Sequence, residues 1–172
     1  CRLRTRTTFE TEEVFQALED QGFTEKDKQD VTRWYDGFTF GPVTDIYNPW
    51  SITNYLDDKK LAVYWANTSR NGLVGTLVKR SSPEIKKQFE TLLRDEYIEV
   101  SFDEQIVFIQ LDHKENAIWS LLLASGYLKV VHMTSFREPD AYLLDQIYTL
   151  ELTNYEVYRM FNGLIQMWFA QA

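Results

Sequence analysis

The chain has 172 residues, of which 44% are hydrophobic and 15% aromatic, a composition typical of folded globular domains and unlike that of disordered chains. Its 26 acidic and 18 basic residues give a formal net charge of −8, which disfavours phosphate-backbone binding by the surface as a whole. The single cysteine, Cys1, excludes an internal disulfide framework and favours a reducing, cytoplasmic compartment. No apolar run reaches the ~18 residues that a membrane-spanning helix requires, so we expect no membrane partner.

The first part of the chain predicts two helices. A short one follows Thr11, carries acidic residues in its first turn and ends at Gly22. The second starts from a capping box formed by Thr24 and Asp27, and Gly37 is its expected C-cap.

Residues 34–56 combine more aromatic side chains and turn-forming residues than any other part of the chain. Gly37 and Gly41 bracket an alternating segment, which predicts a short hairpin arm entered from a helix end. Asn48 followed by Pro49 predicts the N-cap and the first position of a third helix. Because aromatic side chains bury large areas, we interpret this stretch first as a packing nucleus.

The middle of the chain predicts two further helices, after which the spacing of apolar residues changes to the alternation of a strand. Residues 67–69 are expected to start one helix, and Ser82 with Pro83 starts another. Residues 98–102 then alternate between apolar and polar, which predicts a small hairpin around residues 103–104.

The second half predicts a nearly all-apolar helix from Asn116 to Ser125, closed by Gly126. Two strands, at residues 127–133 and 142–152, flank a loop at residues 135–140. The order of helix, strand, helix and two strands resembles a winged-helix unit, which is an analogy at the level of the fold.

The chain ends on a strongly amphipathic helix that a capping box of Thr153 and Glu156 is expected to open. Its apolar face packs on this domain, or on a partner; an exposed face would favour a homo-oligomer. The members of this face are Val157, Met160, Phe161, Leu164, Ile165 and Trp168.

These elements predict an α+β fold that is mainly helical, with a short aromatic hairpin and small antiparallel strands. We expect a helical subdomain at residues 1–80 and a winged-helix-like subdomain at residues 81–152. Residues 153–172 would form a C-terminal helix that leads toward a further domain.

The motifs that catalysis requires are absent. No glycine precedes a lysine, so no phosphate-binding loop is present. Residues 139–140 have the start of a nuclease signature but no later acid-x-Lys, because the last lysine is Lys129. His113 and His132 are isolated from other metal ligands in the sequence. We therefore predict no catalytic residue, no metal site and no cofactor in this chain.

Two alternatives of another class stay open. One is a stand-alone protein-interaction or weak nucleic-acid-binding module built on the winged-helix-like half. Nucleic acid is the weaker partner, because residues 116–125 offer no basic side chain where base edges favour Arg, Asn or Gln. The other is a metal-dependent nuclease that uses Asp112, Glu84 and Lys86.

The segments 34–38 (WYDGF) and 47–51 (YNPWS) together resemble the hallmark of bacterial and archaeal AAA-ATPase-like proteins that carry a C-terminal PD-(D/E)XK nuclease-like domain. Further segments are similar to that family's motifs, in the same order: residues 9–14, 64–69 and 118–128. One segment departs from the pattern, since the family more often has a proline where Thr153 stands before Asn-x-Glu-Val.

The resemblance implies a non-catalytic lid or regulatory segment that couples nucleotide state to the nuclease-like domain. The ATPase core, with its ATP and Mg²⁺, would lie before Cys1, and the nuclease-like domain would begin near the last helix; both are expected partners within one protein. Arg33 is the candidate nucleotide-facing residue, a lid arginine that senses phosphate. The polar residues of the motifs, Asp36, Asn48, Ser51, Asn67 and Thr68 with Arg33, either cap turns or face the ATPase core. The full set of motif and interaction candidates is Trp34, Tyr35, Asp36, Gly37, Phe38, Asn48, Pro49, Trp50, Ser51, Trp65, Asn67 and Thr68.

Overall fold

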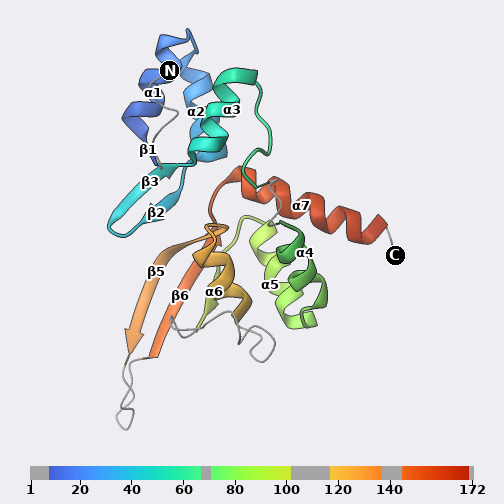
Figure 1. Ribbon diagram of the computed structural model, residues 1–172. Helices are drawn as coiled ribbons and strands as arrows, with labels where there is room; N and C mark the ends of the chain where they lie inside the picture. Colours follow the sequence, from blue (N-terminus) through green and yellow to red (C-terminus); the bar gives the residue numbers. More distant parts are fainter. Residues whose placement is uncertain (1–7, 67–70, 102–116, 137–144, 171–172) are drawn as a thin grey trace. The chain divides into compact units, whose positions relative to one another are not determined.

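The computed structural model describes residues 8–66, 71–101, 117–136 and 145–170 (Figure 1). Within them the chain forms a mainly helical α+β fold with two small antiparallel sheets, as predicted. The chain divides into two compact units. Unit 1 consists of Cys1–Asn71 and Thr153–Ala172, and unit 2 of Gly72–Leu152. This division differs from the expected boundaries at residues 80 and 152. The helix that ends at Arg80 belongs to unit 2 except for its first residue, and the last helix belongs to unit 1.

Unit 1 combines helices with a three-stranded sheet in the order β1-β3-β2. Phe9 of the first strand pairs with Tyr47 of the third, and both side chains are fully buried with Tyr35. The short first strand was not anticipated from the sequence. The elements are β1 (Phe9–Glu10), α1 (Thr11–Asp20), α2 (Glu25–Tyr35), β2 (Phe38–Phe40), β3 (Val43–Tyr47), α3 (Pro49–Asp58) and α7 (Tyr155–Ala170).

The helix starts of unit 1 follow local sequence closely. The backbone N–H of Thr24 donates to Asp27 at 2.7 Å, and that of Asp27 donates to the Thr24 hydroxyl at 3.3 Å, which confirms the capping box of α2. Asn48 caps α3, as predicted, and Pro49 occupies its first position. The aromatic stretch is a packing nucleus, since Ile52, Tyr55 and Leu56 of α3 join the buried cluster of unit 1.

Two boundaries differ from the prediction by one residue. The N-cap of α1 is Glu10, and Thr11 is its first helical residue. The cap of α2 is Asp36 in extended conformation, and Gly37 follows it with a φ of 105°. The helix therefore ends one residue earlier, and the glycine supplies the positive φ that turns the chain into the hairpin.

Unit 2 follows the expected order of helix, strand, helix and two strands, and its sheet has the order β4-β6-β5. Ser82 caps α5, as predicted. The elements are α4 (Asn71–Arg80), α5 (Pro83–Leu93), β4 (Ile98–Val100), α6 (Ala117–Ala124), β5 (Leu128–Phe136) and β6 (Asp145–Leu152). Strand β5 continues into the expected loop at residues 135–140, of which residues 137–140 lie outside the described parts, as do the expected hairpin at 103–104 and the helix start at 67–69.

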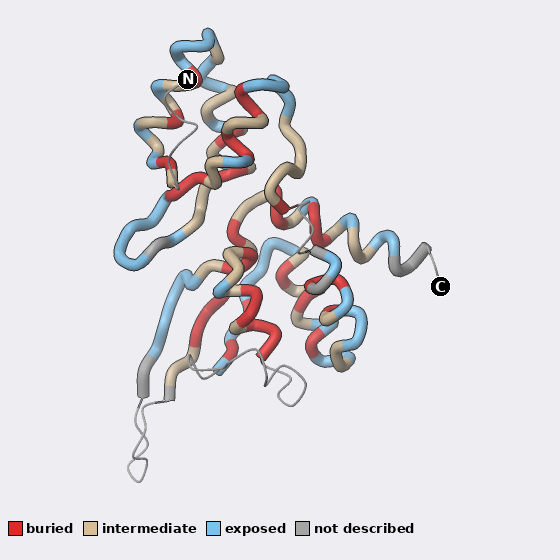
Figure 2. The backbone as a smooth tube through the Cα atoms, in the orientation of Figure 1, coloured by how far each residue is buried: buried red, intermediate tan, exposed pale blue. Residues whose placement is uncertain are grey.

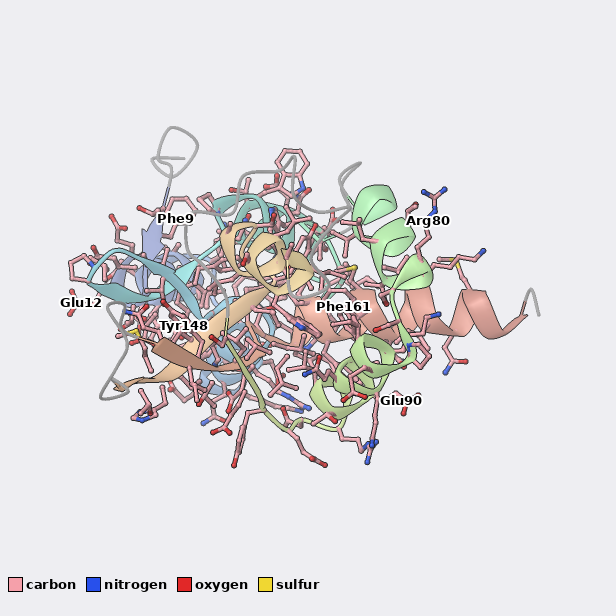
Figure 3. The ribbon with its side chains drawn as sticks, turned by 90° about the horizontal axis from the view of Figure 1, so that it is seen from below. Phe9, Glu12, Arg80, Glu90, Tyr148 and Phe161 are labelled. Carbon is pink, nitrogen blue, oxygen red and sulfur yellow. The ribbon has the colours of Figure 1, made fainter. Side chains whose placement is uncertain are left out.

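Helix α6 belongs to the core of unit 2, as its composition indicates. Most of its residues are buried (Figure 2), and the Trp119 ring lies 4.8 Å from that of Phe89. Charged side chains are among the exposed residues of the other helices; Arg80, for example, points away from α4 (Figure 3). None of the described helices has the length and apolar character needed to cross a membrane.

Candidate functional site

A buried carboxylate forms the most distinctive polar site in unit 1. Glu156, the second residue of α7, has no exposed surface. Its Oε1 accepts hydrogen bonds from the backbone N–H groups of Tyr64 at 2.6 Å, Trp65 at 2.8 Å and Ala66 at 3.4 Å. Successive N–H groups that converge in this way form a backbone anion-binding nest, here occupied by a side chain of the same unit.

The second carboxylate oxygen binds the central motif. The Ser51 hydroxyl donates to Oε2 of Glu156 at 2.9 Å and accepts from the backbone N–H of Trp65 at 3.4 Å. Ser51 is itself fully buried in the first turn of α3. We call this group, formed by Glu156, Ser51 and the backbone of residues 64–66, the Glu156 hub.

The predicted capping box of Thr153 and Glu156 is wrong. Asn154 caps α7 instead, because its Oδ1 accepts from the backbone N–H of Val157 at 3.1 Å. The Glu156 side chain is therefore released from the helix end and binds partners that lie 90 to 105 residues away in sequence. The charged acceptor satisfies three backbone N–H groups there, a larger gain than one local cap provides.

The segment before α7 also contacts the first motif. The side-chain amide of Asn154 donates to the backbone oxygen of Asp36 at 3.0 Å. Gly37 lies so close to Thr153 that a Cβ atom on it would be 2.4 Å from the Thr153 carbonyl oxygen. Asp36 and Gly37 thus position the start of α7 through their backbone.

The loop that carries the nest is tied to α2 as well. The Tyr35 hydroxyl donates to the carbonyl oxygen of Ala62 at 2.9 Å, and the N–H of Ala62 donates back to it at 3.0 Å. Burial raises the pKa of Tyr35, and the nearby Glu156 carboxylate adds to this effect. Tyr35 therefore stays protonated and holds the irregular loop in place.

Burial also raises the pKa of Glu156 above its ordinary value of 4.5, although the bonds from Ser51 and the nest stabilise the ionised form and oppose the shift. Among the ion pairs of the described residues, none involves Glu156. The site is thus an anionic group held by dipoles rather than by a neighbouring cation.

The raised pKa gives a prediction for stability against pH. The folded unit binds the Glu156 proton more tightly than the unfolded chain does, so the contribution of Glu156 to the free energy of unfolding falls as the pH rises through and above 4.5. We expect wild type to lose stability relative to Glu156→Gln as urea unfolding is repeated from about pH 4 to about pH 8. A difference in stability that does not change with pH would contradict this prediction. A gain in the stability of wild type relative to Glu156→Gln would contradict it too, and would show that the hydrogen bonds to Glu156 lower its pKa by more than burial raises it.

Aromatic side chains surround the hub residues. The guanidinium carbon of Arg33 lies 4.4 Å from the centre of the Tyr155 ring, and the Trp34 ring meets Tyr155 edge-on at 4.9 Å. Phe38 packs edge-on against Trp65 at 5.1 Å. Arg33 is exposed, so its cation–π contact leaves the guanidinium edges accessible.

The remaining predicted site residues are not part of the Glu156 hub. Asn48 accepts from the N–H groups of Trp50 and Ser51 as a helix cap. Trp50 is 60% exposed and does not join the hub. Asn67 and Thr68 lie outside the described residues, as do His113 and Asp112.

The described residues gather no metal-binding group. No three His, Cys, Asp or Glu side chains lie together as ligands in the part of the chain that the structure describes. Glu84 and Lys86 are exposed on α5, and His132 is exposed on β5. Among the described residues, neither Glu84 nor His132 belongs to a group of side chains that could bind a metal ion.

Comparisons of this chain with protein-family models, with curated proteins and with solved structures gave no match. The resemblance to AAA-ATPase-like proteins therefore stays a prediction that rests on the motif residues themselves.

Proposed function

We propose that this chain is a non-catalytic lid and regulatory segment of a bacterial or archaeal AAA-ATPase-like protein. In this role it couples the nucleotide state of an ATPase core to a nuclease-like domain, both elsewhere in the same protein. The chain itself supplies a scaffold and no reaction centre.

The observation that supports this proposal is the convergence of the resembling motifs. Asp36 and Gly37 come from the first, Ser51 from the second, residues 64–66 from the third, and Glu156 from the segment that opens the last helix. Their hydrogen bonds serve one another and the backbone. Motif residues that form their hydrogen bonds within the chain favour a structural role, in which the chain transmits a conformational change, over catalysis.

Arg33 is the side chain that we propose for contact with nucleotide. It is exposed at the end of α2, and its contact with Tyr155 of α7 places it beside the hub. A guanidinium held over an aromatic ring keeps its N–H donors free for phosphate oxygens. A nucleotide signal at Arg33 would thus reach α7 directly.

The test uses the chain alone and the protein encoded by the complete reading frame. We expect the isolated chain to neither hydrolyse Mg-ATP nor release heat on titration with it. In the complete protein, Arg33→Ala is expected to lower ATP turnover by about tenfold or more, whereas Arg159→Ala, at an exposed arginine of α7, leaves it unchanged. Hydrolysis by the isolated chain, or a reading frame without a Gly-Lys-Ser/Thr loop upstream, would overturn the proposal.

A second candidate is a stand-alone protein-interaction module. Strand β5 lies at the edge of the unit 2 sheet, and Val130, Val131 and Met133 on it are exposed, a pattern typical of interaction surfaces. Its nucleic-acid form has less support, because α6 carries no basic residue and is largely buried. Sedimentation of the isolated chain separates self-association from a monomer, and the absence of a DNA mobility shift at low salt would eliminate DNA binding.

A further inference from the structure

Unit 2 is an insertion within unit 1. The chain passes from unit 1 to unit 2 between Asn71 and Gly72, and it returns between Leu152 and Thr153. Two covalent crossings therefore connect the units. When two units that are connected in this way move relative to one another, a few residues beside the crossings absorb the change in backbone angles.

The Glu156 hub joins the two segments that lead to these crossings. Residues 64–66 precede the outgoing crossing by a few residues, and Glu156 follows the returning one by a few residues. Three backbone N–H groups of the outgoing segment bind a single carboxylate oxygen of the returning segment. Ser51 binds both segments, since it donates to Glu156 and accepts from Trp65.

Both segments are also fixed to the end of α2. The outgoing one is held through Ala62, which exchanges two hydrogen bonds with the Tyr35 hydroxyl. The returning one is held through Asn154, which donates to the Asp36 carbonyl, and through the close approach of Thr153 to Gly37. Each segment is therefore anchored in unit 1 by its own contacts, and the hub connects the two segments.

We propose that the Glu156 hub is a hinge clamp, which limits the movement of unit 2 by holding the outgoing and returning segments together inside unit 1. Loss of the hub frees residues 64–66 from α7, so that the outgoing segment is no longer held to the returning one. The carboxylate suits this task, because one charged acceptor fixes several donors at once in a buried site. This inference uses the topology and the hub alone, so it stands or falls separately from the proposed ATPase-related function.

The experiment measures the distance between the units. Spin labels are placed on Gln29→Cys in α2 and Lys87→Cys in α5, both exposed, in a Cys1→Ser background. Double electron–electron resonance then gives the distance distribution for the parent chain, for Glu156→Ala and for the milder Ser51→Ala. Glu12→Ala is the control, because Glu12 occupies the same second helical position in α1 but is exposed (Figure 3).

We expect a wider distance distribution for both hub variants and no change for the control. Amide hydrogen exchange at residues 64–66 should become about 10- to 100-fold faster in the same variants. If Glu156→Ala does not fold, the Ser51→Ala result decides. Faster exchange at residues 64–66 with an unchanged distance distribution would overturn the clamp, since the hub would then stabilise unit 1 only.

Discussion

Replacing Glu156 by alanine is expected to lower the free energy of unfolding of unit 1 by about 3–5 kcal/mol. The substitution leaves three backbone N–H groups and the Ser51 hydroxyl without their acceptor in a buried site. A loss of this size is a large fraction of the stability of a typical domain. Urea unfolding followed by far-UV circular dichroism measures it.

Glu156→Gln separates hydrogen bonding from charge. The glutamine carbonyl can accept from the nest, and its amide can donate to Ser51, so we expect a loss of only about 1 kcal/mol. Glu12→Ala should change stability by less than about 0.5 kcal/mol, because Glu12 is exposed. Equal effects for Glu156→Ala and Glu12→Ala would show that the hub contributes little to stability.

Gly37→Ala is expected to destabilise unit 1 by about 3 kcal/mol or more. Gly37 has a φ of 105°, and an added Cβ would lie 2.4 Å from the backbone oxygen of Thr153. A backbone neighbour cannot move aside as a flexible side chain can, so the start of α7 would have to shift. The readout is the midpoint of thermal and urea unfolding.

Gly41→Ala provides the matched control for Gly37→Ala. Gly41 also has a positive φ, of 60°, but no atom outside its chain neighbours lies within 4 Å of the place that an added Cβ would take. Its substitution should therefore cost about 1–2 kcal/mol from backbone strain alone. Similar losses at both glycines would mean that the contact with Thr153 does not restrain α7.

The local parts of this fold are readable from the sequence. Thr24 with Asp27, Asn48 with Pro49 and Ser82 with Pro83 start helices where their spacing predicts, because a cap acts on N–H groups two or three residues away. The burial of α6 follows in the same way from its uniform apolar composition. These interactions are complete within a few residues, so neighbouring residues suffice to predict them.

The site depended on contacts that sequence spacing does not encode. Glu12 and Glu156 each stand second in a helix, and the residues beside them in the sequence do not indicate which of the two is buried. One is exposed, while the other is buried because folding brings Ser51 and residues 64–66 to it. The sequence by itself determined where the capped helices begin and the mainly helical α+β class, although it did not indicate strand β1. Only the tertiary structure decided which acid became the hub and where the units divide, because both depend on segments about a hundred residues apart meeting in space.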